Sequence, residues 1–383
     1  MDFGLSGEQR LLSESVRKVM DRLATPQYVR RLDSEAAYPY ELYDAWTEMG
    51  LLRMPFPEAH GGLGGTLLDM VIIAEELARK SFDFFTAYGA SVFCGLNLLR
   101  NGSSEQCARY LPKLLAGEIR MCVSMSEPDA GSDTGAMRST ARRVNEAWRI
   151  NGQKLWSTGA GARDTLINVY VKTDSKAHYR EGMSLFLVAN DAPGVELRKL
   201  DMLGRRSVGT YEIFFNDVEA GDERLVGGVN RGFHCLLSGL QTERITTAAG
   251  YCGAAQAALD LAVDYARTRK QFGRPIGSFQ AIAHMLADLQ TEVDAGRLFM
   301  LRAAWAATRS GDALREISMA KLFTSETYVK VANAGMQVLG ANGYNMEFDM
   351  QRHFRDARAA TIAAGTSQIQ RNLIAGRMGL KVQ

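Results

Sequence analysis

The sequence has few of the features that mark disulfide-rich, metal-binding or membrane-spanning proteins. Its 383 residues include only five cysteines, which are scattered and form no Cys-x-x-Cys pair. Neither a disulfide framework nor a metal site is therefore indicated, and buried thiols in a reducing compartment, the cytoplasm, are expected. The charged N-terminus has no apolar signal segment. No apolar run approaches the ~20 residues of a spanning helix, so we expect no membrane association.

The charge distribution also excludes some classes of partner. Lysine and arginine total 45 against 43 acidic residues, and no block of five like charges occurs. A nucleic-acid partner is therefore not expected. A hydrophobic content of 46% and a charged content of 23% are typical of globular proteins. The length predicts two or three domains.

Three zones differ in the spacing of their apolar residues. Spacings of three and four predict helices up to residue 118. Between 119 and 229 the period changes to two, and Asn151-Gly152 predicts the tight turn of a hairpin within 148–156. Long helical patterns with short connections follow from 230. We therefore expect a helical domain over 1–118, a small β-barrel over 119–229 and a helical bundle over 230–383.

Several motifs carry candidate chemistry, and each has an ordinary structural alternative. The segment 125–133, MSEPDAGSD, offers hydroxyls and a glycine that admit a ligand, although it is also typical of a turn. The segment 154–159, KLWSTG, places an aromatic on a strand, where core packing is the usual role. Arg269 in 267–276 offers a planar fork for phosphate, or ends a helix favourably. The segments 337–344, QVLGANGY, and 363–370, AAGTSQIQ, complete the series.

These motifs, in this order and spacing, resemble the acyl-CoA dehydrogenase family over essentially the whole chain. The resemblance implies a mainly α fold with a central β-barrel between two helical domains. It also implies one FAD per subunit, an acyl-CoA substrate, an electron-transferring flavoprotein as partner and a homotetramer built as a dimer of dimers. By resemblance, the cofactor-binding residues are Met125, Ser126, Trp156, Ser157, Thr158, Arg269, Gln271, Phe272, Gln280, Gln337, Val338, Gly340, Ala341, Thr366 and Gln368. The substrate-binding residues are Ser132, Arg244, Tyr88, Phe85, Ala364 and Gly365.

The position of the catalytic base departs from the commonest family pattern. Most members carry Glu-Gly-Thr near the C-terminus, whereas this chain has Ala364-Gly365-Thr366. In isovaleryl-CoA and long-chain acyl-CoA dehydrogenases, the Glu instead precedes an Arg on an earlier helix. Glu243-Arg244 matches that arrangement and makes Glu243 the expected base. The alternative is a solvated helix carboxylate paired with a neighbour.

The substrate and the direction of reaction are less determined. No Arg or Lys lies between Phe82 and Leu99, which favours a neutral acyl chain, short or branched. A Glu-Arg pair also occurs in relatives that reduce enoyl-CoA. The leading expectation is therefore α,β-dehydrogenation to the trans-2-enoyl-CoA. An enoyl-CoA reductase, an acyl-CoA oxidase and a non-catalytic flavoprotein are the alternatives.

Overall fold

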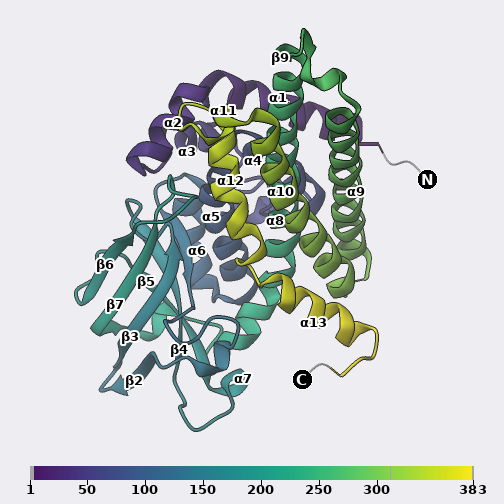
Figure 1. The fold of residues 1–383 in the computed structure, drawn as a ribbon. Helices are drawn as coiled ribbons and strands as arrows, with labels where there is room; N and C mark the ends of the chain where they lie inside the picture. Colours follow the sequence, from purple (N-terminus) through teal and green to yellow (C-terminus); the bar gives the residue numbers. More distant parts are fainter. Residues whose placement is uncertain (1–3, 311, 382–383) are drawn as a thin grey trace.

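The computed structural model describes residues 4–310 and 312–381. Helices form both ends of the described chain, and strands form the middle (Figure 1). This order agrees with the three zones of apolar spacing. The N-terminal helices are α1 (Gly7–Leu23), α2 (Pro26–Glu35), α3 (Tyr40–Glu48), α4 (Leu67–Lys80), α5 (Phe82–Asn101) and α6 (Ser104–Leu115).

Local capping sets where several of these helices begin. Ser6, Thr66 and Ser103 each accept a hydrogen bond from the third residue of the following helix, whose side chain bonds back to the cap. The α5 helix is apolar along its length and long enough to cross a membrane, but 78% of its most apolar window is buried inside the fold. It is therefore placed as a core helix.

The middle zone is one mixed sheet. Its strands are β1 (Arg120–Ser124), β2 (Thr140–Val144), β3 (Ala147–Thr158), β4 (Thr165–Lys172), β5 (Met183–Ala189), β6 (Val195–Leu200), β7 (Thr210–Ala220) and β8 (Leu225–Val226), with the short helix α7 (Tyr179–Gly182) before β5. The order is β6-β7-β3-β2-β4-β5-β8, with β1 beside β4. No pairing joins β6 to β8 among the described residues, so the sheet is open and the predicted barrel is not confirmed.

The predicted hairpin at Asn151-Gly152 is wrong. Both residues lie inside β3, where the register against β7 shifts between Ile150 and Gly152. The turn between β2 and β3 instead uses Asn145, whose φ is 56°. Asn-Gly was misleading because a β-bulge needs the same backbone freedom as a tight turn.

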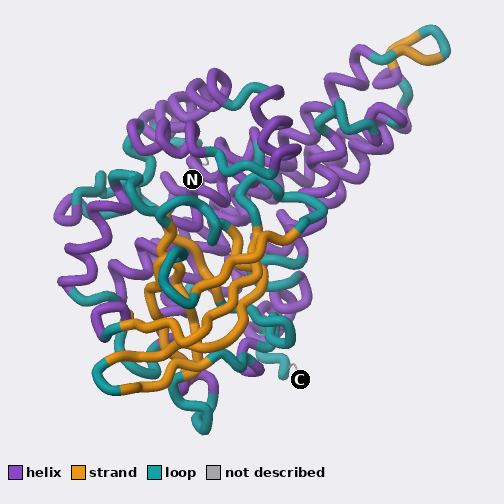
Figure 2. The backbone as a smooth tube through the Cα atoms, turned by 90° about the vertical axis from the view of Figure 1, so that its left-hand side faces the viewer, coloured by secondary structure: helices purple, strands orange, loops and turns teal. Residues whose placement is uncertain are grey.

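The C-terminal zone is built around α8 (Gly232–Thr268). It continues with β9 (Lys270–Gln271), β10 (Arg274–Pro275), α9 (Gln280–Ser310), α10 (Leu314–Leu339), α11 (Ala341–Tyr344), α12 (Met350–Arg358) and α13 (Ser367–Arg377). The middle of α8 is rich in small residues, and this allows close packing. A Cβ at Gly253 would come within 2.1 Å of the Glu75 carbonyl oxygen on α4. In Figure 2 the β9–β10 hairpin projects far beyond the body of the molecule.

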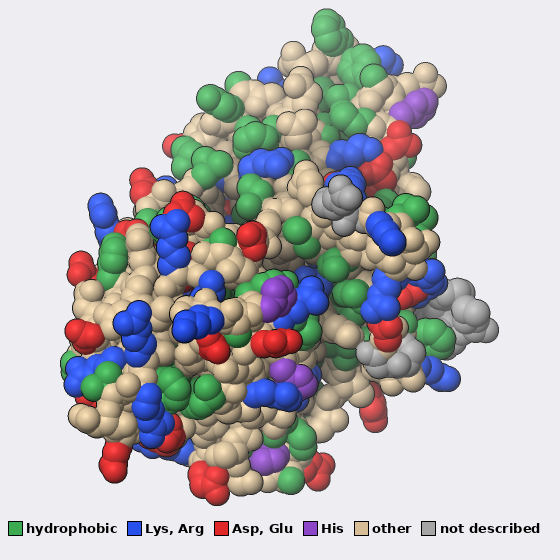
Figure 3. All heavy atoms as spheres, turned by 90° about the horizontal axis from the view of Figure 1, so that it is seen from below, with side chains coloured by type: hydrophobic (Ala, Val, Ile, Leu, Met, Phe, Trp, Pro, Cys, Tyr) green, Lys and Arg blue, Asp and Glu red, His purple; other side chains and the backbone are tan. Residues whose placement is uncertain are grey.

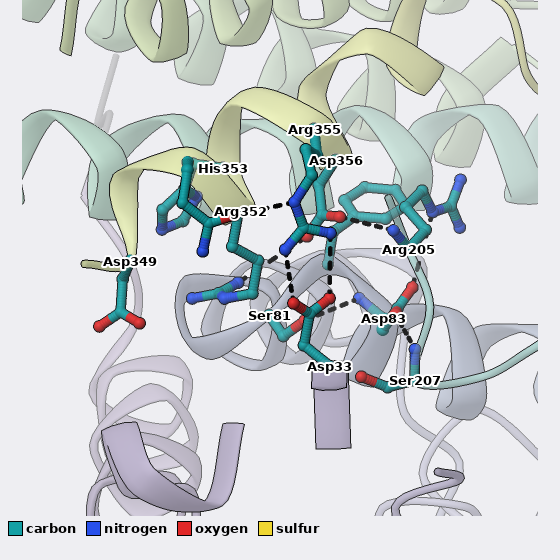
Figure 4. A network of polar contacts seen from close by, with 12 residues as sticks. Asp33, Ser81, Asp83, Arg205, Ser207, Asp349, Arg352, His353, Arg355 and Asp356 are labelled. Atoms are coloured by element: carbon teal, nitrogen blue, oxygen red, sulfur yellow. Dashed lines mark hydrogen bonds and ion pairs between the residues drawn. The ribbon is translucent and has the colours of Figure 1, made fainter. Parts of the chain in front are cut away.

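A cluster of charged side chains joins all three zones (Figure 4). We call it the junction cluster, and it comprises Asp33, Asp83, Arg205, Arg352, Arg355 and Asp356. The Arg355 guanidinium on α12 donates to the Asp33 carboxylate on α2, with Nη2 2.5 Å from Oδ2. The backbone N–H of Arg205, in the β6–β7 connection, donates to Asp356 Oδ1 at 2.5 Å. The cluster therefore locks the sheet between the two helical zones.

The face seen in Figure 3 carries acidic and basic side chains interspersed. No broad field of one sign is visible on that face, which agrees with the near balance of charge in the sequence.

Candidate active site

The Glu243-Arg244 pair lies on α8, where α8 packs against the neighbouring helices. Arg244 is buried, with 9% of its surface exposed, and its Nε has no hydrogen-bond partner within the described residues. Glu243 is partly exposed. Its carboxylate forms no hydrogen bond or ion pair in the part of the chain that the structure describes. Desolvation raises the pKa of Glu243, and Arg244 and Lys321 partly oppose that rise.

The turn over residues 359–366, which we call the C-terminal turn, approaches α8 at this point. Ala364 and Gly365 both have left-handed backbones, with φ of 54° and 84°. A Cβ added at Gly365 would lie 3.7 Å from Arg244 Nη2. The structure therefore places Ala364-Gly365 beside Glu243-Arg244, although about 120 residues separate them in the sequence.

Thr366 is the N-cap residue of α13, and its hydroxyl caps the helix. It accepts a hydrogen bond from the N–H of Ile369 at 3.1 Å, as expected of an N-cap. Behind it, Ser367 Oγ and Gln370 Oε1 are buried and have no partner within the described residues. Gln368 is exposed on the same turn of helix. Buried polar atoms without protein partners indicate a place where a ligand or water is bound.

Trp156 is held open to solvent by a second β-bulge. The register of β3 against β7 shifts between Lys154 and Ser157, and Trp156 has a φ of 64°. Its side chain is 55% exposed instead of packing in the core. Bulges re-aim side chains in this way, and an exposed indole suits stacking on a planar ring. Thr158 lies beside it, 3.1 Å from Thr210 between their hydroxyl oxygens.

The loop that follows β1 is tied to the same strand. The N–H of Leu155 donates to the Ser126 carbonyl at 2.8 Å. Lys154 is fully buried, and its Nζ donates to the Met125 carbonyl at 3.0 Å and to Glu127 Oε1 at 2.8 Å. Met125, Ser126 and Trp156 therefore lie together. Ser132, further along this loop, is exposed.

The Ser157 hydroxyl takes a different direction from its neighbours. Ser157 is buried, and its Oγ lies 2.8 Å from Ser124 Oγ.

The two aromatic residues expected to contact substrate are buried on α5. Tyr88 donates to the Leu51 carbonyl at 3.3 Å, among the N-terminal helices. Phe85 lies against α8, because a Cβ at Gly250 would come within 3.0 Å of its ring.

The remaining predicted cofactor residues lie at the other end of α8. Arg269 is 26 residues beyond Glu243, about 39 Å along a helix. The β9–β10 hairpin carries Gln271 and Phe272, and the Phe272 side chain is 93% exposed. At the same end, Asn342 donates to the Tyr265 hydroxyl at 2.9 Å. The members of this distant group are Arg269, Gln271, Phe272, Gln280, Gln337, Val338, Gly340 and Ala341, of which Val338 is buried and the others are exposed.

The predicted residues thus form two groups that one chain does not bring together. The near group comprises the residues around Trp156 and those around Glu243, and it includes the unpaired buried atoms of Arg244, Ser367 and Gln370. This exposed indole, the hydroxyl groups and the unpaired donors and acceptors fit a large planar cofactor with polar edges. The distant group lies on and around the β9–β10 hairpin and at the adjoining ends of α9, α10 and α11.

Sequence reasoning missed the roles of four charged residues around this site. Lys321 lies four residues after Ile317 on the buried face of α10, so a cation at an apolar position was the available signal. Lys154 and its partner Glu127 anchor the loop under Ser126. For Arg205, the neighbouring residues in the sequence did not indicate a role. Its guanidinium lies 4.4 Å from the centre of the Phe82 ring and donates to Thr86 on α5.

Comparison with known proteins agrees with this arrangement. Residues 6–118, 122–218 and 230–379 match the models of the N-terminal, middle and C-terminal domains of acyl-CoA dehydrogenase. The chain is 38% identical to a mitochondrial 2-methylacyl-CoA dehydrogenase of Solanum tuberosum, over 99% of this chain and 92% of that one.

Two further similarities cover nearly the full length of both chains. The CarC subunit of the caffeyl-CoA reductase-Etf complex of Acetobacterium woodii is 34% identical, over 97% of this chain and 98% of that one. A solved glutaryl-coenzyme A dehydrogenase in complex with glutaryl-CoA superposes with a TM-score of 0.94 at 35% identity, covering 100% of this chain and 98% of that one.

Proposed function

This chain belongs to the acyl-CoA dehydrogenase family, and on that premise we propose that Glu243 is the base that removes the α-proton of its substrate. The reaction is the FAD-dependent dehydrogenation of an acyl-CoA thioester, an oxidoreduction of a CH–CH group. When bound, FAD supplies the acceptor for the β-hydride. One observation carries the proposal. Glu243 is a carboxylate without a partner, beside the turn where Ala364 provides no acid.

The surroundings of Glu243 suit a general base. A carboxylate with a raised pKa holds a proton more strongly than an ordinary one, and the Arg244 charge partly opposes that rise. The unpaired Nε of Arg244 can donate to an oxygen of the bound substrate. Closure of the site over the acyl group would remove water and strengthen both interactions.

We assign the two groups of cofactor residues to two subunits. Met125, Ser126, Trp156 and Thr158 would hold the flavin ring of FAD in their own chain, and the distant group would reach the FAD of a neighbouring chain. The projecting β9–β10 hairpin supports this division. A homotetramer built as a dimer of dimers is the assembly that we propose. The proposed domain limits are 1–118, 119–229 and 230–383.

A neutral, short or branched acyl chain is the proposed substrate class. The Arg205 cation does reach α5, but it is 3.7 Å from Asp83 and bonded to Thr86, so its charge is largely used within the protein. The similarity to a 2-methylacyl-CoA dehydrogenase supports a branched chain. The similarity to an Etf-complex subunit supports an electron-transferring flavoprotein as the electron acceptor. The five cysteines are free thiols, which supports a cytoplasmic location.

Anaerobic mixing of the FAD-loaded protein with a panel of saturated acyl-CoAs tests this function. Flavin absorbance would be followed in the wild type, in Glu243→Gln and in Glu292→Gln, a control at a half-buried Glu on α9 that pairs with Lys330. Bleaching in the wild type and the control, lost in Glu243→Gln while acyl-CoA still binds, is the expected result.

Other outcomes would redirect the proposal. Bleaching that persists in Glu243→Gln would remove Glu243 from its role as base. Reduced flavin that is reoxidised by enoyl-CoA much faster than acyl-CoA reduces it would favour a reductase, the activity named for the Acetobacterium woodii relative.

A further inference from the structure

Lys321 is a cation at a place where a helix in a bundle normally presents an apolar side chain. It lies on the face of α10 that also buries Ile317, Ala320 and Thr324, and none of its surface is exposed. Burying an ammonium is costly unless it is hydrogen-bonded and balanced by charge. Burial lowers its pKa to about 8, so the side chain is still mostly charged at neutral pH.

The ammonium holds the two ends of the C-terminal turn. Lys321 Nζ donates to the Ala360 carbonyl at 3.0 Å and to the Gly365 carbonyl at 2.7 Å. Gln370 Nε2 also donates to the Gly365 carbonyl, at 3.2 Å. Between the two carbonyls held by Lys321, the chain passes through the left-handed residue Ala364. A turn with this backbone is strained and needs such external support.

The same charge acts on Glu243. Several ionisable groups act on the Glu243 carboxylate, and two of those that the structure describes are cations. Those cations are Arg244 and Lys321, and both lower the pKa of Glu243. The uncharged groups are Cys94 on α5, Tyr170 on β4 and Tyr251 on α8. Glu326 is the other acid that acts on Lys321, and it is bonded to Arg371.

We propose that Lys321 is a positioning residue for the reaction: it fixes the C-terminal turn against α8 and supplies a positive charge that acts on Glu243. The inference rests on the proposed role of Glu243 as base. Lys321 does not touch substrate in this account. It acts on the base through charge, and on the substrate-facing turn through its hydrogen bonds.

Three substitutions separate the two actions. Lys321→Arg keeps the charge. Lys321→Gln keeps donors for the carbonyls and removes the charge, whereas Lys321→Met removes both. Lys330→Met is the control, because Lys330 lies on the same helix but is exposed and paired with Glu292.

The readout is the pH dependence of α-hydrogen exchange in D₂O. The FAD-loaded protein would bind an acyl-CoA analogue with sulfur at the β position, which can lose an α-proton but no β-hydride. The exchange rate should fall at low pH, where the base becomes protonated, and we call that part of the pH profile the acid limb. Without the Lys321 charge, the acid limb should lie about one pH unit higher, so that the rate at a given low pH should be about tenfold slower. Lys321→Gln and Lys321→Met should both show this shift, whereas Lys321→Arg and Lys330→Met should not.

The exchange rate at pH values above the acid limb tests the second action of Lys321, its hold on the C-terminal turn. Lys321→Met should fall several-fold below Lys321→Gln, because only Met releases the turn. Acid limbs of Lys321→Gln and Lys321→Met that coincide with the wild type would overturn the inference. Should Lys321→Met fail to fold, Lys321→Gln against Lys321→Arg still decides the role of the charge.

Failure of the parent proposal has a different signature. Glu243→Gln run in parallel should abolish exchange at every pH. Exchange that survives in Glu243→Gln refutes Glu243 as base. Exchange that is lost in Glu243→Gln, with no shift in the Lys321 variants, refutes only the role of Lys321.

Discussion

Two clusters of buried charge in the molecule are built differently. In the junction cluster, the carboxylates of Asp33, Asp83 and Asp356 each accept a hydrogen bond from an arginine or a backbone N–H. The second group, which we call the active-site cluster, comprises Glu243, Arg244, Lys321, Ser367 and Gln370. Its Glu243 carboxylate has no such partner within the described residues, and Arg244 Nε is also unpaired.

The difference indicates what each cluster is for. Buried ions that are bonded across elements hold those elements together, and removing one partner is costly. Within the described residues, Asp83 Oδ1, Arg205 Nε and two nitrogens of Arg352 have no hydrogen-bond partner, but each junction carboxylate still accepts at least one bond. Buried polar groups without partners lower stability and are kept where a ligand will complete them. The junction cluster, whose carboxylates all have partners, therefore joins the three zones, whereas the partnerless Glu243 carboxylate does not hold elements together.

The largest effect on stability is expected from breaking the junction cluster. Arg355→Met leaves the Asp33 carboxylate, which is 8% exposed, without its guanidinium. The free energy of unfolding should fall by about 3–5 kcal/mol in urea titrations. Arg149→Met, which breaks the exposed pair with Glu219, should cost less than about 1 kcal/mol. Equal losses in the two variants would deny the junction cluster its structural role.

Moving the base across the active-site cluster sharpens the comparison. Glu243→Ala should lower dehydrogenation by about 100-fold or more. Adding Ala364→Glu to that variant should restore at least about tenfold of the loss, because the C-terminal turn abuts α8 at Glu243. Recovery should be incomplete, since the new carboxylate would be attached to a different segment from Glu243 and would not meet the proton with the same geometry. No recovery, with acyl-CoA still bound, would mean that the two positions do not address the same proton.

The junction cluster should also give stability a pH dependence. Burial and the Asp356 charge raise the pKa of Asp83 to about 7, against the opposing effect of Arg205. The unfolded chain releases this proton near pH 4, so the contribution of Asp83 is full below about pH 4 and is lost as pH rises through about 7.

The free energy of unfolding should therefore be lower at pH 7 than at pH 4.5. In Asp83→Asn this difference, measured by urea unfolding at the two pH values, should be smaller by about 1–3 kcal/mol. The amide oxygen can still accept the bond from the Ser207 N–H. Asp44→Asn, at an exposed site on α3, should leave the pH dependence intact. An unchanged slope in Asp83→Asn would show that Asp83 is ionised across this range.

The smallest effect is expected at an unpaired atom of the active-site cluster. Ser367 Oγ is buried without a partner in the described residues, so Ser367→Ala removes an unsatisfied group. The free energy of unfolding without ligand should change by no more than about 0.5 kcal/mol. A loss above about 1 kcal/mol would mean that Ser367 is already bonded within the protein.

The sequence predicted the order of the zones and most helices, because apolar spacing and capping residues act locally. Closure of the sheet was not predictable in this way, since it depends on whether the distant edges at β6 and β8 meet. The Asn151-Gly152 pair was misassigned because its partner strand, β7, lies some 60 residues away.

The candidate site was predicted in part. The resemblance named both Glu243 and Ala364, and the structure places their segments together. Lys321 and Arg205 were not identified, because their roles depend on contacts about 40 and 120 residues away along the chain. The residue types show only a cation on a buried helix face and an arginine in a loop. They do not reveal which carboxylate or carbonyl each side chain contacts.

One paired measurement on Glu243→Gln tests the central claim, that the partnerless carboxylate is kept for chemistry. Urea unfolding at pH 7 and α-hydrogen exchange of the β-sulfur analogue would be measured on the same preparation. The account predicts a free energy of unfolding equal to or above that of the wild type, with exchange lowered by about 100-fold or more. Exchange that persists, together with a loss of stability above about 1 kcal/mol, would show Glu243 to be a structural residue and contradict the account.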